Sequence, residues 1–528
     1  MAAETSSVSG ATAVAPDTAS EPRWRPPWVW AIPFAAVFIL VVARNAFLFS
    51  TSMYEQGDSG ANSILIQQAL RLRLLVGNYS REGFNHPGPA YMYIEAAGQW
   101  LGRDVLRLVP TDWNGQFLAV YALDASLLGL AVLIVFGWAG LRAAAAAFGV
   151  LLGFAALHPT VLTSNWMPNL YVMSFFVFLI AASSVAARQS RDLWVMALTG
   201  WLLIHGHACF LFFVPLITAA TLVIAAWPDR RHLPTAIRSF VQRHRGLIIT
   251  VVLISVVFLT PIVINLVLHW PGDFGKYFGY GNSSQAGHHT LHQVVLYALW
   301  YWWPHHHAWI FPLVGYPAAL ASAGWLTRGR LRRCLLTLIA MTVVTSAGFF
   351  FYTAVGIDHL TETYIGYFYW AVPAALALVI AVSVISAIRV SAFRVTAAIL
   401  VAATAVFAVF AALGGLRSST VDNDPLLPGA VRTLAADSHG RIIAIDGRNA
   451  AWVELPGFLV QAERTGVRTC VYQPGTDEVI VTKQFTCTQQ EWDAGARYEF
   501  LATAPPSGAQ VLTRMGNPTF GYAAVVRG

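Results

Sequence analysis

One acidic side chain is the first candidate for chemistry: Asp58, in the segment EQGDSG that spans residues 55–60. Its carboxylate is flanked by glycines, which leave room for a substrate, and it can accept a proton from an incoming hydroxyl. Aspartate also caps helices, because its side chain accepts hydrogen bonds from backbone N–H groups in the first turn. Taken alone, the residue therefore leaves two alternatives, a general base and a helix cap.

A rigid turn with cationic side chains follows Asp58 in the chain. Residues 78–91 read NYSREGFNHPGPAY and carry Arg81 and His86. The prolines fix the backbone of this turn, which holds both side chains in place. Such donors suit the phosphate of a lipid. The alternative is an ordinary interfacial turn whose Arg and His face lipid headgroups.

Long apolar runs must position these loops. The 528-residue chain is 56% hydrophobic and 11% charged, whereas soluble domains average about 25% charged residues. Many runs exceed the roughly 18 residues needed to cross a bilayer. We therefore predict a polytopic α-helical membrane protein of about eleven spans, at residues 28–49, 116–138, 143–158, 169–187, 193–205, 208–227, 247–268, 308–326, 335–355, 370–387 and 395–416.

The basic residues give the orientation. They occur in every second connection between spans, and such connections face the cytoplasm. The net charge of +7 is therefore typical of cytoplasmic loops rather than of a nucleic-acid-binding surface. The connections predicted to face outward are the long loop 50–115, residues 159–168, 206–207, 269–307 and 356–369, and the tail that begins at residue 417.

One outward connection is unusually short. Basic residues at 188–191 and 228–245 place both ends of the intervening hairpin in the cytoplasm. Only about 35 residues are available for two crossings, so the tip His205-Gly206-His207 lies near or below the outer surface. Irregular backbone at that depth needs a polar recess inside the bundle. His205 and His207 either reach a donor phosphate there or satisfy backbone groups and each other.

Composition divides the chain into three parts. Residues 1–27 look like a disordered cytoplasmic N-terminus, residues 28–416 form the transmembrane domain, and residues 417–528 form a small α/β domain outside the cytoplasm. In the last part we predict strands at 441–446, 467–472, 498–502 and 523–527 and a helix at 450–465. Cys470 and Cys487 can form a disulfide in an extracytoplasmic compartment. An amphipathic helix at 58–76 is predicted to lie on the membrane surface.

The loop 50–115 resembles the first outer loop of the GT-C glycosyltransferases, which use polyprenyl-phosphate sugar donors. The matching pieces are the acidic motif at 57–59, the helix after it, and the sequence FNHPGPAYMY at 84–93. The resemblance implies the GT-C fold, Asp58 as the catalytic base and His86 as a contact of the donor phosphate. Many members carry two adjacent acids, whereas here the second position is Ser59. The motif therefore identifies no cofactor with certainty. A divalent cation is possible, although a lone carboxylate binds one weakly.

Further polar residues of the outward loops are candidates for the sugar or acceptor. Asn165 faces a substrate or simply helps to start the fourth span. Glu362 and Asp358, four positions before it, bind an acceptor hydroxyl or pair with a nearby His or Lys. A group of histidines in the loop 269–307 suggests a metal site by number only. The alternative is that their side chains are solvated or face a sugar. The group comprises His288, His289, His292, His305, His306 and His307. The candidates for the acceptor or sugar are Glu55, Asn85, Tyr91, Asn165, His359 and Glu362.

These patterns together predict an inverting glycosyltransferase of the cell membrane, with its site on the outer face. It would move a sugar from a polyprenyl-phosphate donor to an envelope glycan, lipid or protein hydroxyl. The phosphate would be held by Arg81, His86, His205 and His207. The composition points to an actinobacterial envelope. Two alternatives are a transporter or flippase of a lipid-linked intermediate and a non-enzymatic envelope assembly protein.

Overall fold

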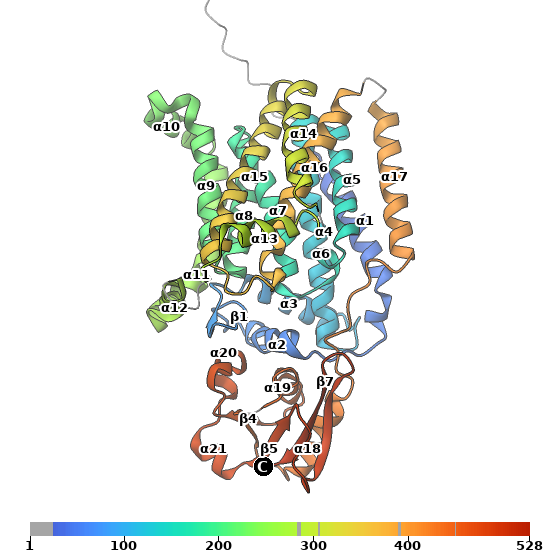
Figure 1. Cartoon of the computed structure of the whole chain (residues 1–528), viewed down its shortest axis with the longest axis vertical. Coiled ribbons are helices and arrows are strands. Elements are labelled where there is room, and N and C mark those ends of the chain that lie inside the picture. The colour runs from blue at the N-terminus through green and yellow to red at the C-terminus, as the bar shows by residue number, and fades with distance from the viewer. Residues whose placement is uncertain (1–24, 282–286, 305–306, 389–391, 449) are drawn as a thin grey trace, which may run out of the picture.

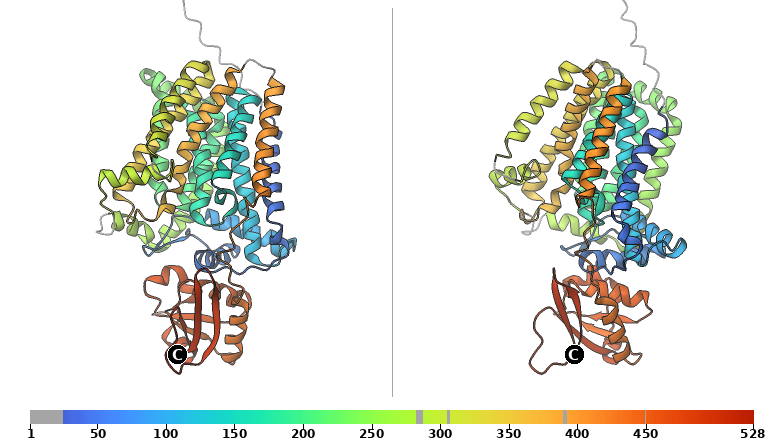
Figure 2. Two further views of the ribbon diagram at one scale, coloured as in Figure 1. Left: turned by 45° about the vertical axis from the view of Figure 1, so that its right-hand side comes forward. Right: turned by 90° about the vertical axis from the view of Figure 1, so that its right-hand side faces the viewer.

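The computed structural model describes residues 25–281, 287–304, 307–388, 392–448 and 450–528. It consists of a tall helical bundle with a small domain at one end (Figure 1). The two further views in Figure 2 show the same division. Both the fold class and the small C-terminal sheet domain predicted from the sequence are confirmed.

Apolar helices build the bundle, and each predicted span overlaps one of them. They are α1 (Trp28–Arg44), α4 (Asp112–Ala139), α5 (Leu141–Leu157), α7 (Met167–Ala186), α8 (Leu193–Gly206), α9 (Phe210–Ala226), α11 (Arg245–His269), α14 (Ile310–Leu326), α15 (Gly329–Val355), α16 (Ala371–Ala387) and α17 (Ala392–Ala412). Within the described ranges, six helical segments have the length and hydropathy to cross a membrane on their own, and five shorter helices are apolar. The number of crossings stays a prediction.

Burial follows position in the bundle. Helix α7 is buried along its apolar length, whereas α11 is almost entirely exposed on the outside. An exposed apolar helix in this setting faces lipid, which solvates its side chains without cost. The connection between α9 and α11 contains α10 (Leu233–Arg243), which lies at the end of the bundle opposite the small domain (Figure 1). This is the end that the basic residues assign to the cytoplasm.

The short elements gather at the other end of the bundle. They are α2 (Gly57–Leu70), the two-residue strands β1 (Tyr79–Ser80) and β2 (Phe84–Asn85), α3 (Ala90–Gln99), α6 (Thr160–Thr163), α12 (Gly272–Gly281) and α13 (Leu291–Trp300). Strands β1 and β2 pair antiparallel and close the turn that carries Arg81. Helix α13 lies in the stretch 269–307, where the sequence predicted a loop.

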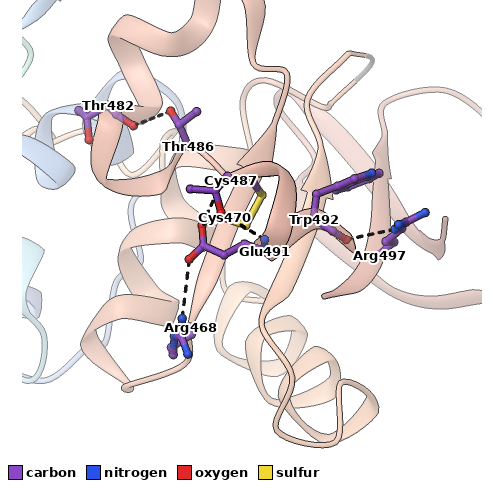
Figure 3. The surroundings of a disulfide bond; sticks show 9 residues. Arg468, Cys470, Thr482, Thr486, Cys487, Glu491, Trp492 and Arg497 are labelled. Atoms are coloured by element: carbon purple, nitrogen blue, oxygen red, sulfur yellow. Dashed lines mark hydrogen bonds and ion pairs between the residues drawn. A yellow bond between two sulfur atoms is a disulfide. The ribbon is translucent and has the colours of Figure 1, made fainter. Parts of the chain in front are cut away.

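The C-terminal domain is a mixed sheet with helices. The strands lie in the order β4 (Thr469–Tyr472), β3 (Ile443–Asp446), β5 (Ala496–Leu501), β7 (Gly521–Arg527) and β6 (Val511–Asn517), with β3 parallel to β4 and β5 and the last two pairings antiparallel. The helices are α18 (Leu427–Asp437), α19 (Leu455–Arg464), α20 (Glu478–Val481) and α21 (Gln489–Ala494). Cys470 on β4 and Cys487 form a disulfide (Figure 3).

Helix α2 lies between the bundle and this domain rather than at a free membrane surface (Figure 1). It ends at Leu70, although the apolar pattern predicted a helix up to residue 76. Leu65 and Ile66 belong to the apolar core of the bundle, whereas Ile64 is fully buried in the core of the C-terminal domain. The two bodies therefore share the helix that carries Asp58.

Candidate active site

A cavity of about 1010 Å³ lies where the outer end of the bundle meets the C-terminal domain. Its lining comes from distant parts of the chain: the turn at 78–86, the start of α7, the ends of α9 and α15, and residues 452 and 477–480 of the C-terminal domain. Asp58, Arg81 and His86 line this cavity, as does His207. The structure thus brings four of the residues predicted for the reaction into one space.

Asp58 lies in the first turn of α2 and is half-buried. One carboxylate oxygen accepts a hydrogen bond from the hydroxyl of Tyr79, and the other accepts one from Nε1 of Trp166 at 2.8 Å. The helix has no side-chain cap: the residue at the capping position is Gln56. Because its bonds go to two side chains of the cavity wall, Asp58 does not act as the cap that the residue type alone allows.

The hydroxyl of Tyr79 is a donor only while it keeps its proton. Burial, and then the neighbouring carboxylate of Asp58, hold the pKa of Tyr79 far above its usual value. The group therefore remains protonated at any physiological pH and donates to Asp58. Two donors fix the orientation of the carboxylate, which lines the cavity.

The C-terminal domain fixes the start of α2 through its backbone. Gly57 donates its N–H to the carbonyl of Val453 at 2.6 Å, and a Cβ added to Gly60 would lie 2.7 Å from the nitrogen of Gly457. Only glycine permits this close approach of two backbone segments. The acid in the cavity is therefore positioned as much by the domain as by the bundle.

A buried cation connects the same elements. The guanidinium of Arg464 on α19 lies 2.8 Å from the carboxylate of Glu55 and 2.6 Å from that of Asp112 at the start of α4. Glu55, which the sequence placed near the acceptor, is 2% exposed and stands outside the cavity. In this structure it joins the acidic loop to the C-terminal domain.

A second carboxylate stands beside the acidic motif, at a position that no local pattern could indicate. Ser59, which occupies the position of the second acid, donates its hydroxyl to Asp422 at 3.0 Å. Burial, opposed by this hydrogen bond and increased by the charge of Asp58, raises the pKa of Asp422 to about 6. The residue follows α17 and precedes the C-terminal domain, 363 positions away from Ser59.

Arg81 lies in the turn between β1 and β2 and also lines the cavity. Its guanidinium binds the carboxylate of Asp358 at 2.6 Å and also pairs with Glu362. The turn is further held from α12, where Lys276 donates to the carbonyl of Gly83 at 2.6 Å. Asp358 and Glu362 therefore pair with a cation, although the partner is an arginine rather than the His or Lys that the sequence suggested.

The histidines divide into two groups. The rings of His86 and His207 lie 4.2 Å apart, and both line the cavity. Burial, and then the neighbouring His207, hold the pKa of His86 well below its usual value, so it is neutral. Its Nδ1 accepts from the N–H of Ala208 at 3.3 Å, which places the ring proton on Nε2.

His205 lies outside the cavity lining. Its Nδ1 accepts from the N–H of Ala90 at 3.3 Å, and its Nε2 contacts the carbonyl of Phe258 at 2.8 Å. Both ring nitrogens are thus used by the backbone, one of the two alternatives that the sequence left open. The residue holds the hairpin tip against the turn after β2.

The other residues predicted for the acceptor or sugar also lie outside the cavity lining. Tyr91 is buried and donates to Ser174 at 2.8 Å, and Asn165 donates to Glu95 at 3.4 Å. Asn85 donates to the carbonyl of Gly77 at 3.2 Å, while His359 is exposed beside Asp358. Of the residues that follow Asn165 in the chain, Trp166, Met167 and Pro168 line the cavity.

The predicted histidine group is spread out. His289 contacts the carbonyl of Ile357 at 2.8 Å, and His305 and His306 lie outside the described residues. Within the described ranges, no three His, Cys, Asp or Glu side chains are grouped so as to hold a metal ion.

The chain has the GT-C fold, with the apolar helices of a multi-pass membrane protein. Similar solved structures include those of ArnT from Cupriavidus metallidurans. One, bound to undecaprenyl phosphate, superimposes with a TM-score of 0.57 at 15% identity over 94% of this chain and 98% of that chain. The apo structure gives 0.56 at 15% identity over 94% and 97%. No family model and no curated protein matches the chain by sequence.

Proposed function

We propose that the protein is a glycosyltransferase that moves a sugar from a polyprenyl-phosphate donor to a hydroxyl group, with Asp58 as the general base. The observation that carries the proposal is the carboxylate of Asp58 in the cavity, held by Tyr79 and Trp166. A base must be ionised, oriented and open to the substrate. The similarity in fold to a protein crystallised with undecaprenyl phosphate supports the choice of donor.

The reaction is one displacement. The acceptor oxygen attacks the anomeric carbon, its proton passes to Asp58, and the bond from that carbon to the phosphate oxygen breaks with its electrons going to the lipid phosphate. The configuration at the anomeric carbon is inverted. A phosphate leaving group needs a cation and hydrogen-bond donors rather than a general acid.

The cavity offers such groups for the phosphate. Arg81 supplies a permanent charge, and the neutral ring of His86 supplies its Nε2–H. Because Arg81 is already bound to Asp358 and Glu362, the donor must displace these carboxylates in part. His207 stacks on His86 and keeps that ring in place.

An apolar flank of the cavity suits the lipid chain. Phe212 of α9 and Phe351 of α15 lie 5.5 Å apart at ring centres, line the cavity and are partly exposed on the outside of the bundle. A polyprenyl tail can lie on these rings without leaving the membrane. Its phosphate then enters at the level of Arg81.

The decisive test is Asp58→Asn in membranes supplied with donor and acceptor lipids of the host. We expect loss of transfer, by a factor of about 100 or more for a missing general base, with unchanged protein level. Asp437→Asn, a carboxylate of the C-terminal domain that pairs with Arg527 away from the cavity, should keep full activity. Full activity of Asp58→Asn would refute the proposal.

The product can be found in the same strains. A deletion strain is complemented with the wild-type chain, with Asp58→Asn or with Asp437→Asn, and its envelope lipids and glycans are profiled. The proposal requires one glycan or lipid species to disappear with the deletion, return with the wild type and Asp437→Asn, and stay absent with Asp58→Asn. A product that also returns with Asp58→Asn favours a transport or assembly role instead.

A further inference from the structure

The C-terminal domain supplies its own wall of the cavity. Trp452, Asp477, Val479 and Ile480 line the space, together with the residues of the bundle. The ring of Trp452 lies edge-on to that of Tyr79, with centres 6.0 Å apart. Tyr79 in turn donates to Asp58. A group bound on Trp452 is therefore one side chain away from the proposed base.

Charge is distributed unevenly over the cavity. Among the described lining residues, the carboxylates are Asp58, Glu82, Asp358 and Asp477, and Arg81 is the single guanidinium or ammonium group. Arg81 is bound to Asp358 and Glu362, whereas the described lining residues of the C-terminal domain include Asp477 and no cation. The wall formed by the C-terminal domain therefore carries negative charge without a cation of its own.

Asp477 is the source of that charge. It lies just before α20, is half-buried, and forms no ion pair with any residue in the part of the chain that the structure describes. Burial raises its pKa. A phosphate bound on this wall would lie beside a carboxylate that has no ion-pair partner among the described residues, and like charges repel.

An aromatic ring and a carboxylate without a partner together fit one kind of ligand. The face of an aromatic ring is electron-rich, and it attracts the weakly positive C–H groups on the face of a sugar ring. A carboxylate accepts hydrogen bonds from sugar hydroxyls, and it is free to do so only where no cation occupies it. Both groups discriminate against anions and favour neutral hydroxyl-bearing rings.

We propose that Trp452 and Asp477 form the acceptor subsite and that the acceptor is a neutral glycan, whose sugar ring rests on Trp452 with a hydroxyl directed to Asp58. This inference rests on the proposed function, which places the reacting hydroxyl at Asp58. It assigns to the C-terminal domain the recognition of the acceptor and to the bundle the recognition of the lipid donor. Phosphate-bearing acceptors are excluded by the charge of this wall.

The test measures sugar binding to the full-length protein in lipid nanodiscs, because alkyl-glucoside detergents would compete. Saturation-transfer NMR detects ring protons of a weakly bound sugar. The probes are the methyl glycosides of glucose, mannose, galactose and arabinose, with glucose 6-phosphate as the anionic probe. We expect saturation of at least one neutral glycoside and none of glucose 6-phosphate. Equal or stronger saturation of glucose 6-phosphate would overturn the proposal.

Variants then assign the subsite. Trp452→Ala should weaken binding of that glycoside about 2- to 12-fold, the range of one aromatic contact, and Trp452→Phe should restore most of it. Trp492→Ala is the matched control, because this tryptophan of the same domain stacks on Tyr472 and lies outside the cavity lining. Asp477→Lys should admit glucose 6-phosphate. Unchanged binding in Trp452→Ala, or equal loss in Trp492→Ala, refutes the subsite.

Binding and transfer separate this inference from the proposed function. Asp58→Asn should still bind the neutral glycoside, since Trp452 and Asp477 are unaltered, while transfer is lost. If Asp58→Asn retains transfer, the proposed function fails whatever the binding shows. If transfer depends on Asp58 but Trp452→Ala binds the glycoside normally, the acceptor subsite alone fails.

Discussion

The two walls of the cavity are built in different ways. The wall of Asp58 is buried between two cores: Ile64 packs into the C-terminal domain, Gly60 contacts Gly457, and Arg464 joins two carboxylates beneath it. The wall of Arg81 is a short hairpin at the surface, held by its own strand pairing, by Lys276 of α12 and by ion pairs of a guanidinium whose side chain is 36% exposed.

This difference matches the two tasks of the proposed reaction. A base must hold one position relative to the attacking hydroxyl, since small displacements cost much of the rate. A phosphate-binding arginine must exchange its carboxylate partners for the donor, which requires ion pairs that break easily. Exposed ion pairs contribute little to stability, about 0–1 kcal/mol each.

The largest effect is expected from Arg464→Met. The change leaves Glu55 and Asp112 as neighbouring carboxylates in a buried place, which costs about 3–5 kcal/mol. Thermal unfolding in nanodiscs should show the loss, and hydrogen exchange of α2 should rise. Arg71→Met is the control, because its pair with Glu463 is exposed and its loss should change stability by about 1 kcal/mol or less. Equal effects of the two changes would show that the Asp58 wall is no firmer than the surface.

A smaller effect is expected from Tyr79→Phe, which removes one of the two donors to Asp58. Hydrogen bonds to charged groups contribute about 1.5–3 kcal/mol, so turnover should fall about 10- to 100-fold. The half-saturating donor concentration should stay the same, because Arg81 is unaltered. Tyr93→Phe, whose hydroxyl donates to the carbonyl of Leu74 outside the cavity, should leave turnover unchanged. An unaltered rate in Tyr79→Phe would mean that the orientation of Asp58 does not depend on this donor.

The sequence predicts well whatever depends on local pattern. Apolar runs located the helices, and the alternation of basic residues located the loop that carries Asp58, Arg81 and His86. The strands β3, β4, β5 and β7 also followed from short apolar runs between turn signals. The start of α2 at Gly57 agrees with the predicted helix to one residue.

What the sequence did not predict depends on contacts between distant segments. Trp166 lies 108 positions from Asp58, and Asp422 lies 363 from Ser59. The apolar stripe of α2 that suggested a membrane surface is divided between two protein cores, with Ile64 in the C-terminal domain and Leu65 and Ala69 in the bundle. An apolar stripe does not tell lipid from protein. Glu55 was predicted to contact the acceptor because the sequence does not show that Arg464 pairs with it. No spacing rule connects such residues before the fold brings them together.

The smallest effect, and the one that separates the two walls most clearly, is on the pH dependence of stability. In the Asp58 wall, burial raises the pKa of Asp422 to about 6. A raised folded-state pKa stabilises the protein below the unfolded value, about 3.9, and this contribution is lost as the pH rises through about 6. Asp422→Asn, which stays neutral, should therefore match the wild type at pH 4 and exceed it above pH 6, by about 1–2 kcal/mol after allowing for partial solvation.

In the Arg81 wall the sign is reversed. Burial opposes ionisation of Asp358, but hydrogen bonding from the backbone of His359 and the charge of Arg81 together lower its pKa. A lowered pKa gives stability above the unfolded value that is lost as the pH falls. Asp358→Asn should therefore be less stable than the wild type at pH 7 and approach it at low pH, the opposite of Asp422→Asn. Thermal unfolding of both variants between pH 4 and pH 8 gives two difference curves. If the curves have the same sign, the two walls do not differ in the way that the proposed division between base and phosphate site requires.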